Sequence, residues 1–489
     1  MRFYPLSWVS LVLLAGVLAP VAAPAMPAAD AKHLVGRTGF GAGPDDIAAL
    51  DKLTHEQAVR RLLDTARREP FTKLPDFLAT RPDWPGQYRS KDDLAKQEFN
   101  RTRDREGAAL KAWWYGEMIA TPSPFTERMV LFWHNHFTSS FDKVRQPDLM
   151  YKQQAIFRRH AFGSFRAMLM EVAKDPAMIK YLDNVSNKKG GANENFAREL
   201  LELFTLGEGN YTEKDIKEAA RAFTGWQVNE TNGTYFFNAR DHDDGAKTVF
   251  GRTGKFGGED IVNIVLDQPK VAPYITAKLW RSLISDNPDP KEVERLAGIF
   301  RASDYNIRAL VEAMLLSPAF LAPANRAVLV KSPVDLLVGT IRMLNMPVSD
   351  TAPLVDYGRR LQQDILNPPN VKGWPGGINW VSTHTLIQRR DILGRFLRGE
   401  EVNVAAPTGM EAMMAMQAAV DPVETNRPPP PLRQFGVAGW MKMNPQLAGN
   451  PQAISNILLA TAPVATVFDG RDPSVMIERI LLDPAYQVK

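Results

Sequence analysis

The chain has 489 residues, a length that allows two or three domains, and it contains no cysteine. The lack of cysteine excludes a disulfide framework, a thiolate nucleophile and a lipid-modified cysteine. Its 59 basic and 55 acidic residues nearly cancel, and no stretch concentrates Lys and Arg as a phosphate backbone demands. Nucleic acid is therefore not expected as a partner.

The N-terminus predicts export. Arg2 precedes an apolar run from Trp8 to Val21, and small residues that a signal peptidase accepts follow, up to Ala25. We therefore expect residues 1–25 to be a signal peptide that is removed from a periplasmic or secreted bacterial protein. An uncleaved membrane anchor is the alternative, but the run is shorter than a spanning helix. No transmembrane helix is expected after cleavage.

Helix-start signals recur along the chain. At five positions a Ser or Asp that can cap a helix precedes a proline, which is well tolerated at the first helical position. These pairs are Ser123-Pro124, Asp175-Pro176, Ser317-Pro318, Ser332-Pro333 and Asp472-Pro473. Helical periodicity follows them, whereas the alternation typical of strands is scarce. We predict a mainly α fold, a multi-helix globular body with long irregular loops and one small β-hairpin near Tyr235.

Composition divides the chain into a body and an extension. Residues 28–398 form the predicted main helical domain, and residues 399–489 form a C-terminal extension. The extension carries a Met-rich run and then four consecutive prolines within 407–433. Such a segment is typical of a semi-rigid linker.

Two histidines lie in the aromatic run FTERMVLFWHNHFTSS, which begins at Phe125. At helical spacing His136 shares the apolar face with Phe125 and Met129, and His134 lies near Glu127 on the polar edge. Burying an imidazole is costly unless a partner compensates it. Both histidines are candidate metal ligands, and His136 is also a candidate acid–base residue. The alternative is that each is a core histidine with a structural partner.

The segment NENFARELLELFTLG from Asn193 carries the next candidate. Glu199 borders Phe196 and Leu203 at the edge of an apolar helical face, so it is a candidate metal ligand or general base. Arg198 lies on the opposite face and is interpreted as a surface ion-pair partner.

The motif DHDDG, which ends at Gly245, is a third candidate. Asp241, His242 and Asp243 could hold a hard cation together with the other candidates. A solvated turn is an equal alternative, because the spacing departs from an EF-hand loop.

Two tryptophans lie in the long Pro- and Gly-rich stretch that begins at Pro368. Trp374 and Trp380 could stack on a sugar ring or another flat ligand. We favour the interpretation that they pack this long loop onto the helices.

Several motifs follow one another along the chain: HLVGRTGFGAGPDDI, WHNHF, NENFARELLELFTLG, AARAFTGW, DDGAKTVFG, KSPVDLLVGTIRML and NVKGWPGG. In this order they resemble the bacterial domain-of-unknown-function family 1800, over roughly His33 to Arg398. The resemblance implies a largely helical exported protein. It also implies a partner, because genes of this family often neighbour those of a second exported family that resembles alkaline phosphatases and sulfatases.

Two functions compete at this point. The first is a periplasmic or secreted metal-assisted hydrolase, in which a divalent ion held by the His, Glu and Asp candidates would activate a water. The second is a non-catalytic binding or scaffold protein for the exported phosphatase- or sulfatase-like partner, in which the same residues form a buried polar network. We prefer the enzyme slightly, because ionisable residues collect in apolar segments.

Overall fold

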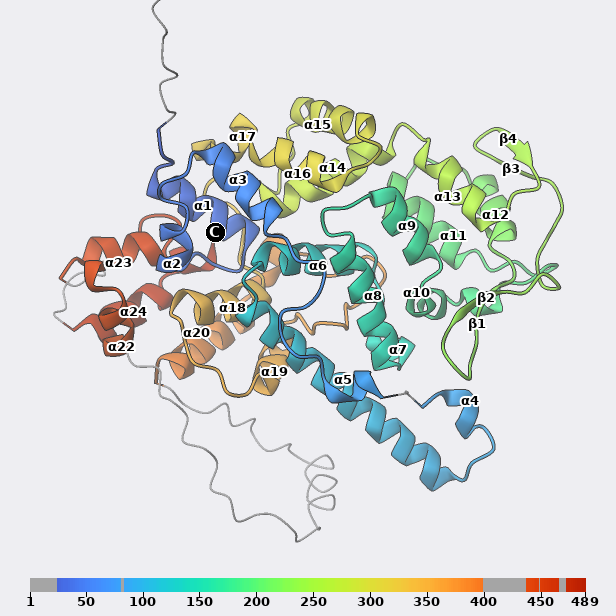
Figure 1. Ribbon diagram of the computed structural model, residues 1–489, viewed down its shortest axis with the longest axis horizontal. Helices are drawn as coiled ribbons and strands as arrows, with labels where there is room; N and C mark the ends of the chain where they lie inside the picture. The colour runs from blue at the N-terminus through green and yellow to red at the C-terminus, as the bar shows by residue number, and fades with distance from the viewer. Residues whose placement is uncertain (1–23, 81–82, 399–436, 448, 466–471) are drawn as a thin grey trace, which may run out of the picture.

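Helices provide most of the regular structure of the chain. The structure, a computed structural model, describes residues 24–80, 83–398, 437–447, 449–465 and 472–489. Within these residues the strands form only two small antiparallel pairs, so the predicted mainly α fold is confirmed (Figure 1). Residues 1–23 of the predicted signal peptide and the predicted linker at 407–433 lie outside the described residues.

In the first part of the described chain, residues 24–222, the regular elements are helices. Its α-helices are α1 (Ala28–Thr38), α2 (Pro44–Ala48), α3 (His55–Asp64), α4 (Pro85–Tyr88), α5 (Asp93–Ala120), α6 (Pro124–His136), α7 (Phe141–Val144), α8 (Pro147–Arg159), α9 (Phe165–Ala173), α10 (Pro176–Tyr181), α11 (Asn195–Glu199) and α12 (Glu213–Ala222). Two short 3-10 turns, η1 (Asp76–Ala79) and η2 (Asn184–Ser186), join them. Helix α11 continues directly into the π-helix η3 (Leu200–Leu206).

The second half begins with four short strands and returns to helices. The strands are β1 (Trp226–Val228), β2 (Tyr235–Phe237), β3 (Lys247–Val249) and β4 (Arg252–Gly254). The helices are α13 (Gly258–Leu266), α14 (Val271–Leu283), α15 (Pro290–Ala302), α16 (Ile307–Leu315), α17 (Pro318–Leu321), α18 (Pro333–Met343), α19 (Ala352–Arg360), α20 (Thr383–Arg398), α22 (Val437–Met443), α23 (Pro451–Leu458) and α24 (Pro473–Leu482). Short 3-10 turns are η4 (Pro323–Asn325), η5 (Gly377–Trp380), η6 (Pro445–Leu447) and η7 (Pro484–Gln487). Among the described helices, none combines the length and the apolar character needed to cross a membrane.

The two hairpins lie together at one end of the molecule (Figure 1). Strands β1 and β2 pair in antiparallel register, with Val228 opposite Tyr235, and form the hairpin that the sequence predicts. Strands β3 and β4 form a second hairpin, in addition to the single hairpin expected from the sequence.

The predicted helix starts are confirmed at all five Ser-Pro or Asp-Pro pairs, which begin α6, α10, α17, α18 and α24. The capping bond itself is not universal. Asp175 accepts a hydrogen bond from the Met178 amide, whereas Ser123 makes no side-chain cap bond. The fixed backbone angle of the proline is the feature that all five starts share.

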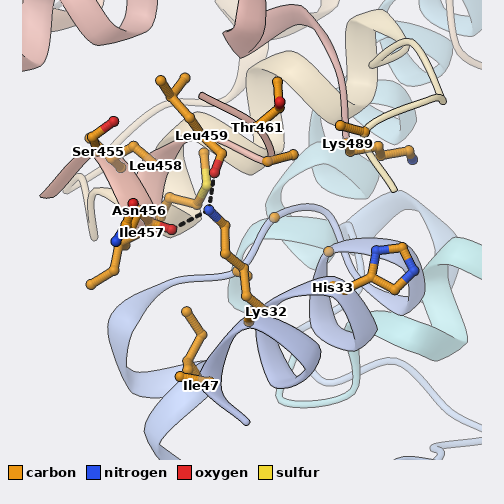
Figure 2. Close-up of a pocket in the computed structure, with 18 of the residues that line it drawn as sticks. Lys32, His33, Ile47, Ser455, Asn456, Ile457, Leu458, Leu459, Thr461 and Lys489 are labelled. Carbon is orange, nitrogen blue, oxygen red and sulfur yellow. Dashed lines mark hydrogen bonds between the residues drawn. The ribbon is translucent and has the colours of Figure 1, made fainter. Parts of the chain in front are cut away.

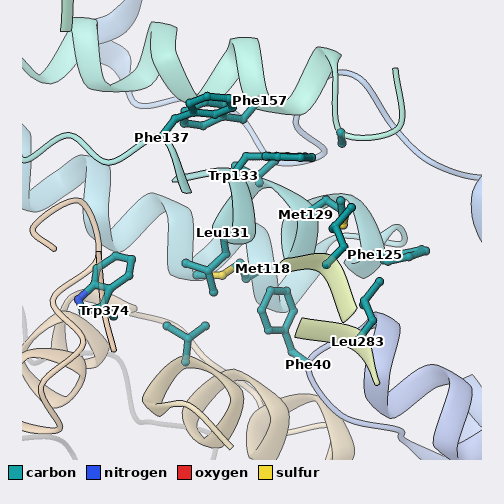
Figure 3. Packing of buried hydrophobic residues seen from close by; sticks show 14 of the residues in the cluster. Phe40, Met118, Phe125, Met129, Leu131, Trp133, Phe137, Phe157, Leu283 and Trp374 are labelled. Atoms are coloured by element: carbon teal, nitrogen blue, oxygen red, sulfur yellow. The ribbon is translucent and has the colours of Figure 1, made fainter. Parts of the chain in front are cut away.

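Helix α6 lies in the middle of the apolar core (Figure 3). Its side chains are apolar or aromatic around most of its circumference, so it is stable only where other elements cover it. Phe125, Met129 and Trp133 are each at most 1% exposed. Helices α1, α5 and α8 pack against it, and Figure 3 shows Phe157 of α8 and Leu283 of α14 in the same cluster.

Segments from the two ends of the chain meet. Helices α1 and α2 lie beside α23, and residues of all three helices line one cavity (Figure 1). Val330, just before α18, forms a bridge with Val488, and the Tyr486 hydroxyl lies 2.7 Å from the Thr340 hydroxyl of α18. Helix α24 also packs against α20. The described C-terminal residues therefore pack directly on the helices of the main body.

A buried ion pair ties α6 to α8. The Arg158 guanidinium donates to both carboxylate oxygens of Glu127, at 2.6 and 2.8 Å, and the two side chains are 0% and 2% exposed. The indole N–H of Trp114 in α5 donates to the same carboxylate at 2.9 Å. Three helices therefore depend on one buried carboxylate.

We expect Glu127→Gln to lower the free energy of unfolding by about 3–5 kcal/mol, because it leaves Arg158 buried without its counter-charge. Urea denaturation followed by circular dichroism measures this change. Glu56→Gln is the matched control, since Glu56 forms an exposed pair with Arg60 and should leave the midpoint unchanged. Equal effects of the two substitutions would contradict the assignment.

Candidate functional site: a cationic cleft beside α6

A cleft of about 400 Å³ opens beside α6. Its walls come from α6, α14, the residues around the start of α18, the loop at 372–377 and the last residue of the chain. Its charged side chains are five cations and two carboxylates, so the lining is cationic. They are Arg128, Lys278, Arg281, Lys372 and Lys489, with Asp286 and Asp335.

The structure brings together three of the residues predicted from the sequence. His136, Trp374 and Trp380 all line this cleft. The other candidates lie outside the lining: His134, Glu199, Asp241, His242 and Asp243.

Asn135 joins two separate sequence motifs at the cleft wall. Its side-chain oxygen accepts from the Trp374 amide at 2.6 Å, and its amide group donates to the Trp374 carbonyl at 3.4 Å. Gly373 has φ +81°, and a β-carbon there would lie only 2.2 Å from the Asn135 oxygen. Glycine is therefore required before Trp374 for the loop to dock on α6.

The π-helix η3 directs the Leu203 carbonyl toward Lys278, a residue of the cleft wall. The Gly207 amide donates to the Glu202 carbonyl at 3.0 Å, one residue further back than in an α-helix, so it does not bond to the Leu203 carbonyl. That carbonyl instead accepts from the Tyr274 hydroxyl at 2.9 Å and from the Lys278 ammonium at 3.3 Å. The π turn thus creates an acceptor for a buried cation.

His136 is held between η3 and α14. Its Nε2 lies 3.1 Å from the Phe204 carbonyl, which can only accept, so Nε2 carries the proton. Its Nδ1 is then the acceptor for the Lys278 ammonium at 3.0 Å. Burial and the neighbouring Lys278 hold the pKa of His136 well below its usual value. The imidazole is therefore neutral.

Lys278 differs from the other cations of the cleft in its surroundings. Its neighbours are the neutral His136 and the Leu203 carbonyl, and within the described residues no carboxylate forms an ion pair with it. Burial, and then the charge of Arg281 on the next turn of α14, lower the pKa of Lys278 to about 8. Such an amine exchanges its proton close to neutral pH.

Asp335 forms ion pairs with two of the other cations. Arg128 and Lys489 both form ion pairs with its carboxylate, Lys489 at 2.7 Å. Burial alone would raise the pKa of Asp335, but the two cations outweigh it and hold the pKa far below its usual range. One positive charge therefore remains at this pair of cations, and Lys278 and Arg281, which form no ion pair among the described residues, add to it.

His134 points away from the cleft. Helix α6 continues through His136, so the two imidazoles leave the helix in different directions and the extended arrangement considered from the sequence does not form. Both ring nitrogens of His134 are buried without a hydrogen bond among the described residues. Its ring packs edge-on against Trp114 and Trp374, and burial lowers its pKa to about 3.

Glu199 is half-buried at the end of α11. Burial and the nearby Glu202 raise its pKa, while Arg198 and Lys372 act in the opposite direction. Because Lys372 lines the cleft, Glu199 lies in the electrostatic neighbourhood of the cleft without reaching into it.

The DHDDG residues form a turn that is held by hydrogen bonds and an ion pair to neighbouring elements. Asp243 accepts from the Arg221 guanidinium at 2.7 and 3.2 Å, and this bond lowers its pKa to about 2. Asp241 accepts from Gln227 at 2.7 Å, and His242 Nδ1 lies 2.9 Å from the Thr224 carbonyl. In the part of the chain that the structure describes, no three His, Asp or Glu side chains are grouped as a metal site requires.

Most of the surface of Trp374 and Trp380 is buried against other residues, and little of it faces the cleft. They are 4% and 5% exposed, so their rings belong mainly to the core while one edge of each reaches the cleft wall. This arrangement matches the favoured interpretation, in which they fix the loop to the helices.

The sequence analysis missed the cations and the amide that shape the cleft. Asn135 lies between the two histidines of the WHNHF motif, and this position is the sequence feature that could have identified it as a site residue. Lys278 interrupts the apolar run of α14, a weak signal, because lysines at such places usually extend to solvent. Asp335 was not predicted as a site residue, because its place three residues after Ser332 is explained by the capping box at the start of α18.

The fold and the cleft define a mainly α protein with a cationic site built around a His–Lys pair. A family model described as "Protein of unknown function (DUF1800)" matches residues 33–488, and the chain belongs to this family. The match includes the C-terminal residues beyond 398, where the sequence motifs had ended. No curated protein and no solved structure matches the chain.

We expect Lys278→Met to remove a pH-dependent part of the stability. Between about pH 8 and 10.5 the unfolded chain binds more protons at this lysine than the folded protein, so the native protein gains stability as the pH rises. The free energy of unfolding of the native protein should therefore rise by about 2–3 kcal/mol relative to Lys278→Met. Urea denaturation at a series of pH values measures the difference, with Lys91→Met as an exposed control. A constant difference would contradict the assignment.

Proposed function

We propose that the protein is an exported enzyme that hydrolyses a small acidic substrate held in the cationic cleft. The observation that carries this proposal is Lys278, an amine that is buried against a neutral imidazole and has no carboxylate partner among the described residues. A buried ammonium with such neighbours reduces stability, and groups of this kind concentrate at functional sites.

The charges of the cleft favour an anionic ligand. Arg128 and Lys489 share the single carboxylate of Asp335, and Arg281 forms no ion pair among the described residues, so the lining keeps positive charge that can attract an acid group. Charge pairs are stronger in a partly enclosed site than in water, so a carboxylate, phosphate or sulfate would be oriented there.

Lys278 can then transfer a proton. In its neutral form it takes a proton from a water as that water attacks the electrophilic centre of the substrate, and the resulting ammonium returns a proton to the leaving group. His136 is a positioning residue: the Phe204 carbonyl fixes its tautomer, so that Nδ1 always accepts from Lys278. The Leu203 carbonyl orients the same amine from the other side.

Export is part of the proposal. Pro24 and Ala25 are exposed, whereas Met26 is 5% exposed and its amide donates to the Leu53 carbonyl at 2.8 Å. Cleavage after Ala25 would thus release the signal peptide at the boundary of the folded body. The mass of the protein recovered from a bacterial periplasm should correspond to a first residue Met26, and a longer chain would argue against this step.

A non-catalytic binding role is the second candidate. Arg281 and Lys372 are exposed cations at this cleft, and they could receive an acidic segment of an exported phosphatase- or sulfatase-like partner. Ligand binding without turnover would favour this role.

We expect the mature protein to hydrolyse acidic p-nitrophenyl compounds, tested as the phosphate, sulfate, hemisuccinate and glucuronide. The neutral glucoside is the matched control for the glucuronide. The rate should rise with pH through about 8, as Lys278 loses its proton, and Lys278→Met should lower kcat/KM at least about 100-fold. Lys91→Met should leave it unchanged.

Thermal unfolding with each anion separates binding from catalysis. Stabilisation that Arg281→Met removes, without release of nitrophenol, would replace the enzyme by the binding role. A rate that does not change in Lys278→Met would overturn the role of this amine.

The metal-assisted mechanism that the sequence suggested can be tested by metal analysis. Both ring nitrogens of His136 are engaged, and the Asp243 carboxylate is bonded to Arg221, so we expect no stoichiometric metal at these residues. Elemental analysis of mature protein purified without chelator measures this. One equivalent of a transition metal that is lost in His136→Ala would restore the metal-assisted mechanism.

A further inference from the structure

A second cavity, of about 720 Å³, lies where the two ends of the chain meet. Figure 2 shows Lys32, His33 and Ile47 facing residues 455–461 across it, with Lys489 to one side. Its volume falls within the range of small-molecule sites, which is about 300–1,000 Å³.

The walls of this cavity are mainly apolar. They include Ala28, Phe40, Ile47, Met343, Ile457 and Leu459. Gly36 of α1 also faces this space, and a β-carbon added there would meet no atom within 4 Å. The cavity therefore has room at the surface of α1 that the described residues do not fill.

Three lysines are among the polar groups that line the cavity, namely Lys32, Lys331 and Lys489. Lys331 is 8% exposed, and its ammonium lies 3.5 Å from the ring centre of Tyr486. Among the described residues no oxygen accepts a hydrogen bond from this ammonium. Lys32 donates to the carbonyls of Asn456 and Leu459 (Figure 2), and Lys489 donates to Asp335.

Positive charge in the cavity exceeds negative charge. Asp335 is the buried carboxylate of this lining, and Arg128 already shares it with Lys489. Lys331 therefore keeps a buried positive charge whose contact is an aromatic face, beside an unfilled apolar space.

We propose that this cavity binds an amphipathic monoanion, a carboxylate on an unbranched apolar chain, with the carboxylate at Lys331 and the chain along the apolar wall. Charge and shape both support this ligand. A carboxylate would supply the acceptor that Lys331 lacks, and the chain would fill the space beside Gly36. Burial, with the nearby charges of Lys32 and Lys489, lowers the pKa of Lys331 to about 7, an effect that a bound anion would offset.

This site is distinct from the cleft beside α6. Asp335 and Lys489 line both spaces, whereas Lys278 and Arg281 line only the cleft and Lys331 lines only the cavity. Substitutions can therefore separate the two proposals.

Isothermal titration calorimetry of the full mature protein with dodecanoate tests the proposal. We expect one site per chain, and affinity that falls by up to about fourfold for each methylene removed toward octanoate, which corresponds to about 0.8 kcal/mol per methylene. Dodecanol and acetate are the matched probes that carry only the chain or only the anion. Both should bind much more weakly than dodecanoate.

Two variants locate the site. Lys331→Met keeps the length of the side chain and should weaken dodecanoate at least tenfold while leaving dodecanol unchanged. Gly36→Leu should weaken both ligands by filling the cavity, and it favours the helix, so the protein should remain folded. Lys91→Met and the cleft variant Lys278→Met should both leave dodecanoate binding unchanged.

Three results would overturn the proposal. They are no binding of dodecanoate, acetate binding as tight as that of dodecanoate, and unchanged dodecanoate binding in both Lys331→Met and Gly36→Leu. Dodecanoate binding that is lost in Lys278→Met alone would move the ligand to the cleft and also overturn the proposal.

Discussion

The interior of this protein depends on one buried carboxylate, that of Asp335. It closes the capping box of α18 with Ser332, forms an ion pair with Arg128 of α6, and forms another with Lys489 at the end of the chain. A buried carboxylate is costly without such partners, so the pairing fixes the positions of these three segments together. The same carboxylate stands in the wall of both cavities. The electrostatics of two separate sites therefore rest on a group whose first role is structural.

Local patterns in the sequence were sufficient to predict where helices begin. They were insufficient to predict the role of the turn at DHDDG. A cap followed by proline acts within one turn of helix, and each such pair does begin a helix. Asp243, in contrast, could hold a cation or a guanidinium equally well on the sequence alone. Its partner Arg221 comes from another element, so only the tertiary structure could assign the contact.

The cleft was predicted only in part for a similar reason. His136 and Trp374 stood out because an ionisable or large aromatic group in an unusual run is visible in the sequence. Lys278 did not, because its importance depends on a carbonyl that the π turn of η3 leaves free. In a π turn each hydrogen bond spans one residue more than in an α turn, and no residue pattern in this segment predicted the difference.

The meeting of the two chain ends has a consequence for how the molecule is made. Lys32 donates to the carbonyl of Leu459, a residue 427 positions later. While the chain emerges from the ribosome, the side of α1 that carries Lys32 cannot meet Asn456 and Leu459 until these residues have been added, although α2, α3 and α6 can pack against α1 earlier. Contacts between such distant residues slow folding and prolong the exposure of apolar surface. A chaperone that shields the first helix during synthesis would protect the part of this protein that waits longest for its partners.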